Sequence, residues 1–71
     1  MKHTKLFGSS NVDSAGYDPE KLEMEVRFLN GDTYVYSAVP AGIHAGLLLA
    51  PSAGSYLHQH VKGKFNYRKK D

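Results

Sequence analysis

Residues 22–28 alternate strictly between apolar and charged side chains. This period is typical of a strand with one buried face, and it predicts the most secure element of the chain. Asn30-Gly31 then supplies the positive φ values that a tight hairpin needs, and residues 32–39 are rich in aromatic and β-branched side chains. The pattern therefore predicts a second strand after the turn. A shorter first strand is expected within residues 9–17, before a turn at Asp18-Pro19.

The length of the hairpin turn decides which way Tyr34 and Tyr36 point, because a shift of one residue moves every side chain to the other face. A two-residue loop at 30–31 leaves both tyrosines on the charged face of the sheet. A three-residue loop at 29–31 with a bulge at its glycine places Tyr34 opposite Val26 and turns both tyrosines into the core. We favour this second register because it separates apolar from polar positions more cleanly.

Helical spacing replaces the strand pattern beyond the second of these strands. Pro40 suits the first position of a helix, and apolar side chains then recur at helical intervals up to residue 50, where Pro51 ends the pattern. Ser52 is well placed to cap a second helix, which Gly63 would end. The sequence therefore predicts an α+β fold, in which a small antiparallel β-meander of about three strands precedes two short α-helices packed on one face.

The chain has 71 residues, no Cys, no Trp and a formal net charge of +2. Such a length can bury one modest core, so we expect a single domain at residues 9–68, a flexible N-terminus at 1–8 and a basic C-terminal tail at 69–71. The absence of Cys removes disulfides and thiolate metal sites, and it suits a reducing compartment. Because no segment is apolar enough for a signal peptide or a bilayer span, we expect a cytoplasmic protein without membrane contact.

Charge is distributed unevenly along the chain. Residues 62–71 carry five basic side chains and one acidic side chain, which gives +4, whereas residues 1–61 carry four and six, which gives −2. Aromatic rings lie within the basic segment, so its cations could hold phosphates while a ring stacks on a base. The alternative is a solubilising terminus whose rings dock on the core. The candidate nucleic-acid contacts are Lys62, Lys64, Tyr67, Arg68, Lys69 and Lys70.

Other chemistry has little support in the sequence. His58 and His60 would point to nearly opposite sides of a helix, so no metal site is predicted, and His44 is expected to be a solvated flank of the first helix. No nucleophile-elbow motif accompanies the serines and histidines, so we infer no catalytic residue, no cofactor and no small-molecule substrate. Gly54 costs helix stability relative to Ala, which either tight packing or an anion site would explain. The candidate anion site consists of Ser52, Gly54 and Ser55.

Three blocks of the chain, residues 34–40, 51–56 and 61–67, resemble the KTSC domain in their order and residues. This small domain takes its name from the C-terminus of some lysyl-tRNA synthetases and also occurs as a free-standing protein in bacteria and phages. The resemblance covers nearly the whole chain from about Ser9. Its signature, a Tyr-x-Tyr followed shortly by Val-Pro, is matched by residues that we expect in the core: Tyr34, Tyr36, Val39 and Pro40.

The resemblance implies no established activity, and its suggestion of RNA binding comes from the synthetase setting by analogy. We therefore expect a non-enzymatic binding module with RNA as the leading partner. The rival is a protein-interaction module, such as a phage or prophage factor that binds a host protein or self-associates through a sheet edge or an apolar patch. Exposure of Tyr34 and Tyr36 would favour nucleic acid on the sheet, whereas their burial would direct attention to the tail and the second helix.

Overall fold

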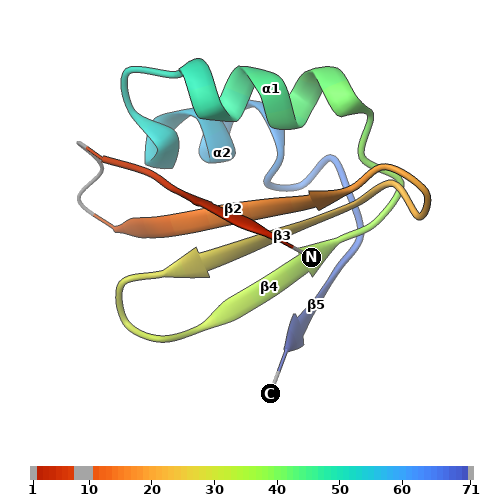
Figure 1. The fold of residues 1–71 in the computed structure, drawn as a ribbon, viewed down its shortest axis with the longest axis horizontal. Helices are drawn as coiled ribbons and strands as arrows, with labels where there is room; N and C mark the ends of the chain where they lie inside the picture. The colour runs from red at the N-terminus through yellow and green to blue at the C-terminus, as the bar shows by residue number, and fades with distance from the viewer. Residues whose placement is uncertain (1, 8–10, 71) are drawn as a thin grey trace.

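The computed structural model describes residues 2–7 and 11–70, and within them it shows a five-stranded antiparallel sheet with two helices on one face (Figure 1). The helices α1 (Ala41–Leu49) and α2 (Ala53–His60) come between the fourth and fifth strands. Neither helix has the length and hydropathy that crossing a membrane requires. The strands lie in the sheet in chain order: β1 (His3–Lys5), β2 (Val12–Asp18), β3 (Glu23–Phe28), β4 (Thr33–Tyr36) and β5 (Tyr67–Lys70).

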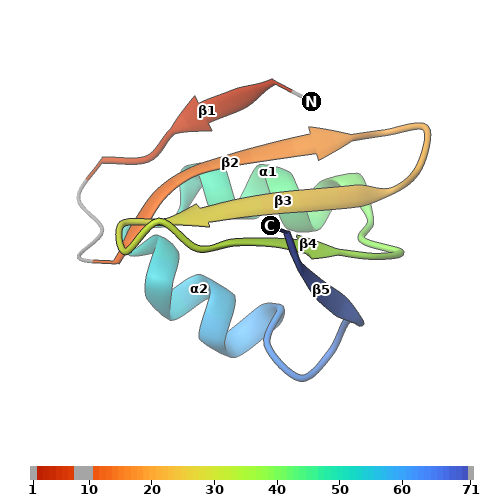
Figure 2. The same ribbon diagram turned by 90° about the horizontal axis from the view of Figure 1, so that it is seen from below.

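The α+β class and the two covering helices are confirmed, but the sheet has five strands rather than about three. The two additional strands, β1 and β5, form its edges (Figure 2). Both strands are short and rich in polar and charged residues, so the sequence shows no alternation of apolar and polar side chains that would predict them. Charged side chains are typical of edge strands because they discourage pairing with another chain. The sheet thus extends into segments 1–8 and 69–71, of which residues 1, 8 and 71 lie outside the described part.

The hairpin between β3 and β4 has the register that we favoured. Tyr34 lies opposite Val26, so Tyr34 and Tyr36 both face the helices. The amide of Phe28 donates a 2.8 Å hydrogen bond to the carbonyl of Asp32, which closes the three-residue loop at 29–31. Gly31 has φ +96°, a left-handed conformation that glycine adopts without steric cost. The turn chemistry therefore sets the face on which both tyrosines lie.

The core lies between the helices and one face of the sheet. Tyr36 and Val39 of the family signature are buried, and Tyr34 is half-buried against them. Pro40 is exposed, contrary to the expectation, because it is the N-cap of α1 and stands before the residues that pack on the sheet. The buried apolar cluster consists of Val12, Ala15, Met24, Val26, Tyr36, Val39, Leu47, Ala53, Leu57 and Val61.

The start of α2 follows the sequence prediction. Ser52 is its N-cap, and the hydroxyl oxygen of Ser52 accepts a 3.3 Å hydrogen bond from the amide of Ser55. A Cβ added at Gly54 would lie 2.6 Å from Oδ1 of Asn11, just before β2. The glycine therefore allows close packing of α2 against the chain entering β2. Gly63 follows the helix with φ +79°.

His44 on α1 is half-buried, which corrects the expectation of a solvated flank. Its ring stacks on Tyr17 with a centroid distance of 5.1 Å, and its Nε2 atom is buried with no hydrogen-bond partner among the described residues. Burial lowers the pKa of His44 below its ordinary value of 6.5, because the charged imidazolium would lose its hydration. The side chain is therefore held in the neutral form as part of the packing between α1 and the sheet.

We expect stability to fall as the pH drops below 6.5, the ordinary pKa of this histidine. The unfolded chain binds a proton there, whereas folded His44 does so only at lower pH, so acid favours unfolding. Thermal melting at about pH 7.5 and about pH 5.5 measures the loss. His44→Phe keeps the stacked ring but cannot titrate, so it should reduce the difference in Tm, whereas His58→Phe at an exposed position should not. An unchanged difference in His44→Phe would contradict this account.

Candidate nucleic-acid interface

A groove of about 600 Å³ is lined by residues of α2 and of the sheet. Figure 2 shows the turn that carries the chain from α2 to β5 beside these elements. Tyr34 and Tyr36 pack toward the helices, so the rings of both tyrosines line this groove beside α2 and the C-terminal segment. We call it the α2 groove. Its lining residues are Asn11, Phe28, Tyr34, Tyr36, Gly54, Leu57, His58, Lys62, Gly63 and Tyr67.

Tyr67 is the exposed ring of the α2 groove, with 63% of its surface accessible. It packs edge-on against Tyr34 at a centroid distance of 5.6 Å and tilted against Tyr36 at 5.7 Å. Burial raises the pKa of Tyr36, and the hydroxyls of Tyr67 and Tyr34 raise it further, so Tyr36 stays neutral. The inner rings contact Tyr67, and the exposed part of its side chain is accessible to a stacking partner.

Two smaller hollows continue the α2 groove at its ends. One, at the N-terminus of α2, is lined by Ser52 and Ser55 and shares Asn11, Gly54 and His58 with the groove. The other is lined by Lys64 and shares Gly63 and Tyr67 with it. The structure thus brings together, along one depression, the residues of the predicted anion site and three of the predicted nucleic-acid contacts: Lys62, Lys64 and Tyr67.

The remaining predicted contacts lie on β5, and each makes an ion pair with a carboxylate of the acidic body. Their side chains nevertheless remain more than half exposed. By contrast, Lys62 and Lys64 make no ion pair with any carboxylate of residues 2–7 and 11–70. The pairs are Arg68 with Glu23 at 3.4 Å, Lys69 with Asp32 at 3.4 Å, and Lys70 with Glu25 at 3.2 Å.

The basic residues of the C-terminal segment therefore fall into two groups in the folded protein, those paired with acids of the described residues and those that are not. The β5 cations lie beside acids of β3 and of the turn before β4, and the exposed pairs of Arg68 and Lys69 contribute only about 0–1 kcal/mol each. The two lysines between α2 and β5 carry charge that no described carboxylate balances. Sequence reasoning located the basic segment but gave no sign of this division.

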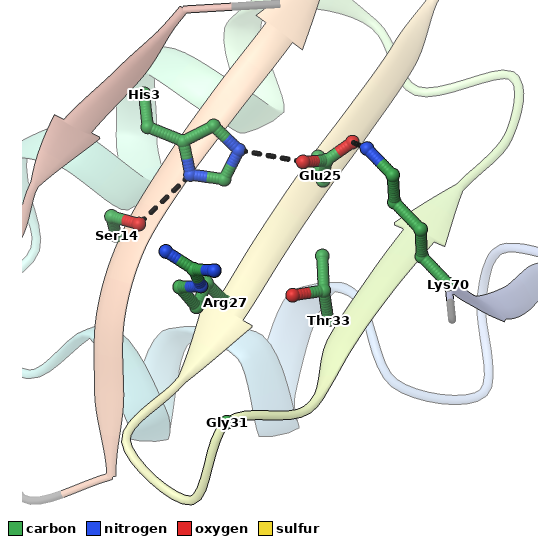
Figure 3. Close-up of a pocket in the computed structure, with 7 residues that line it drawn as sticks. All are labelled: His3, Ser14, Glu25, Arg27, Gly31, Thr33 and Lys70. Carbon is green, nitrogen blue, oxygen red and sulfur yellow. Dashed lines mark hydrogen bonds and ion pairs between the residues drawn. The ribbon is translucent and has the colours of Figure 1, made fainter.

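The helix-free face of the sheet holds a second pocket, of about 380 Å³, which sequence reasoning missed (Figure 3). Nδ1 of His3 lies 2.8 Å from Oγ of Ser14, and Nε2 of His3 lies 2.8 Å from Oε1 of Glu25. Lys70 donates to the other oxygen of Glu25 at 3.2 Å. These residues come from four different strands, and no local motif joins them, so only strand pairing could reveal the cluster.

The hydrogen bonds of this pocket determine the charge of Glu25. Burial alone would raise the pKa of its carboxyl group, but the hydrogen bonds and positive charges of His3 and Lys70 outweigh burial and bring the pKa below its ordinary value of 4.5. Glu25 is therefore ionised at neutral pH. Its carboxylate joins edge strands β1 and β5 to the middle of the sheet through one side chain.

Comparison with known proteins supports the resemblance seen in the sequence. A family model described as the KTSC domain matches residues 8–65. The chain belongs to the KTSC domain family. An uncharacterized KTSC relative from Stutzerimonas stutzeri is 44% identical over 62 residues, which cover 87% of this chain and 86% of that protein. A lysine–tRNA ligase from a Nostoc species is 36% identical over 58 residues, which cover 82% of this chain and 10% of the ligase.

Solved structures show the same KTSC fold. The crystal structure of a KTSC domain protein from Yersinia pestis matches this chain with a TM-score of 0.90 and 35% sequence identity, covering 99% of this chain and 97% of the other. The family thus includes small proteins of similar length and segments of a ligase. These comparisons identify the KTSC domain as a small module, and they assign it no reaction of its own.

Proposed function

We propose that this KTSC domain is a binding module for single-stranded RNA, and that the strand lies along the α2 groove and its two extensions. The observation that carries the proposal is the meeting, at one depression, of the exposed Tyr67 ring with Lys62 and Lys64, two cations that pair with no carboxylate of the described residues. A nucleobase would stack on Tyr67 while the lysines contact phosphates on either side of it. Stacking of this kind tolerates any base and contributes about 1–3 kcal/mol per base.

The N-terminus of α2 would hold a further phosphate of the same strand. Ser52, Gly54 and Ser55 line the hollow that continues the α2 groove in that direction. Amides at a helix N-terminus point outward and favour negative charge, and the hydroxyl of Ser55 adds a donor. This placement supports a strand that crosses the domain from Ser55 toward Lys64.

Arg68, Lys69 and Lys70 have a secondary part in this proposal. The ion pairs of Arg68 and Lys69 are exposed and weak, so a phosphate can replace their carboxylate partners at little cost, whereas Lys70 is held by the buried carboxylate of Glu25 and contributes least. The occurrence of a similar segment in a protein named lysine–tRNA ligase agrees with an RNA partner. The main contribution of positive charge is nevertheless assigned to Lys62 and Lys64, which pair with no carboxylate in the described part of the chain.

The combined substitution Lys62→Ala and Lys64→Ala should weaken binding of a single-stranded RNA oligonucleotide about tenfold at low salt. It should also reduce the slope of log affinity against log salt by about 1.4, since each contact with a single strand contributes about 0.7. Tyr67→Ala should weaken binding about fivefold or more and leave the salt slope unchanged, because stacking releases no counterions. Fluorescence anisotropy from about 50 to about 200 mM salt measures both quantities.

The matched control is the combined substitution Lys2→Ala and Lys21→Ala, which removes the same charge from exposed positions outside the α2 groove. It should change affinity and salt slope much less than the groove variant does. Equal effects of the two double variants would show that the RNA is bound by general charge attraction and not at the α2 groove. No RNA binding by the unmodified protein at low salt would contradict the proposal itself.

A second candidate function, a protein-interaction module, is supported by the surface of α1. This helix contains no charged residue, and its outward side carries Leu48 and Leu49, the latter 85% exposed. Helices without a polar face are usually covered. Self-association that depends on these leucines, or capture of a protein that survives nuclease treatment, would favour this function over RNA binding.

A further inference from the structure

A hydroxyl, an imidazole and a carboxylate form one chain of hydrogen bonds on the helix-free face of the sheet (Figure 3). The distances from His3 to Ser14 and from His3 to Glu25 are both 2.8 Å, within the range in which a base activates a nucleophile and a third group orients the base. The three residues lie on β1, β2 and β3, so the ladder of the sheet holds them in place.

The charge of Glu25 sets the tautomer of neutral His3. The ionised carboxylate accepts a hydrogen bond, so the imidazole carries its proton on Nε2 and donates it to Oε1 of Glu25. Nδ1 then has a free electron pair and accepts the hydroxyl proton of Ser14. Lys70 binds the second oxygen of Glu25 and keeps the carboxylate from turning away. The arrangement therefore points the basic atom of His3 at Ser14.

The backbone at Ser14 also departs from a regular strand. The register of β2 against β3 shifts between Val12 and Ser14, as in a β-bulge. Bulges often stand next to active sites because they re-aim a side chain. Ser14 is largely buried, yet it lines the pocket together with His3.

Arg27 and Thr33 complete the wall of the pocket opposite His3. Arg27 is paired with Ser14 across one ladder and with Thr33 across the next, and Figure 3 shows both side chains directed into the same hollow. The guanidinium of Arg27 makes no ion pair with the described carboxylates. A free guanidinium and a hydroxyl beside a nucleophile are donors for the oxygen that becomes negative when a carbonyl is attacked.

We propose that Ser14 is a nucleophile that takes the acyl group of activated carboxylic esters, with His3 as its general base and Glu25 as the group that orients His3. Oγ of Ser14 forms a bond to the carbonyl carbon while its proton passes to Nδ1 of His3, and Arg27 binds the resulting oxyanion. The bond to the alcohol oxygen then breaks, and His3 gives the proton to the leaving oxygen. Water removes the acyl group by the same route, so one ester and one water yield one acid and one alcohol.

This reaction is independent of the proposed RNA binding, because its residues lie on the opposite face of the sheet from the α2 groove. The test is labelling with a fluorophosphonate, which reacts with activated serine hydroxyls, followed by the mass of the intact protein and of its peptides. The unmodified protein, prepared without an added histidine tag, should gain one adduct at Ser14. Ser14→Ala should gain none, and His3→Gln should react at least about 100-fold more slowly.

Matched controls separate this chemistry from general reactivity. Ser37→Ala and His60→Gln, which remove a hydroxyl and an imidazole outside the pocket, should label at the unmodified rate. Arg27→Gln should label more slowly while its Tm stays unchanged, since Arg27 makes no ion pair with a carboxylate of the described residues and acts only on the oxyanion. Circular dichroism and thermal melting identify any variant whose fold is lost. If Ser14→Ala or His3→Gln does not fold, the labelling rate of Arg27→Gln is used to test the proposal instead.

Two results would overturn the proposal. The first is no adduct on the unmodified protein in a reaction that fully labels a serine protease. The second is labelling of Ser14→Ala at the unmodified rate, which would place the reactive group elsewhere. Labelling of Arg27→Gln at the unmodified rate would contradict its oxyanion role. With p-nitrophenyl acetate, a burst of about one product per chain that Ser14→Ala lacks would support the acyl intermediate.

Discussion

Leu47→Ala is expected to lower the free energy of unfolding by about 3 kcal/mol. Leu47 is fully buried and is the residue of α1 that lies in the core, with Ile43 packed partly buried against it. Its truncation removes apolar contacts and leaves a cavity between the helix and the sheet, and both effects destabilise the folded state. A domain of this size has a total stability of roughly 5–10 kcal/mol, so the loss is a large fraction of the whole.

Leu49→Ala is the matched control for this prediction. It makes the same chemical change two residues further along the same helix, where the side chain is 85% exposed. Its effect should remain within about 0.5 kcal/mol, because an exposed leucine has little contact to lose. Urea denaturation gives both values through the midpoint and the slope. Equal losses at the two positions would contradict the orientation of α1 described above.

Gly46→Ala and Gly42→Ala are expected to shift stability in opposite directions. A Cβ at Gly42 would meet no atom of the described residues within 4 Å, so the variant gains the better helix propensity of Ala, about 1 kcal/mol. A Cβ at Gly46 would overlap the hydroxyl of Tyr56 and lie 2.8 Å from Cζ of its ring. That hydroxyl donates a 3.0 Å hydrogen bond to the carbonyl of Ile43, so the ring cannot move without breaking the contact between α1 and α2. The expected net loss is about 1–2 kcal/mol.

Thermal melting distinguishes the two glycines, since about 1 kcal/mol shifts the Tm of a small domain by roughly 4–8 °C. Combining Gly46→Ala with Tyr56→Phe tests the cause, because the smaller ring side chain removes the overlapping oxygen. The double variant should lose less stability than the sum of the two single variants. Additive losses, or stabilisation by Gly46→Ala, would show that Tyr56 is not the obstacle.

The candidate sites differ in how much of them the sequence could predict. Lys62, Lys64 and Tyr67 were predicted as contacts because a basic segment with aromatic residues is visible in the linear sequence, and the fold gathers them at the α2 groove and the hollow that continues it. The pocket of Ser14 and His3 was not predicted, because its residues are separated by 11 and 22 positions along the chain and share no motif. Chemistry that depends on strand pairing leaves no local pattern.

Local patterns in the sequence determined the hairpin of β3 and β4, the two helices and the family signature. Strict alternation and the loop at Gly31 set the register, and Ser52 set the start of α2, because such features depend on residues close together in the chain. Only the tertiary structure decided the edge strands, the burial of His44 and the pairing of the β5 cations with acids of the body. Each of these features depends on a contact with a segment that is distant in the chain. The residues next to a charged edge strand or a single histidine in the sequence do not indicate which distant segment it will contact.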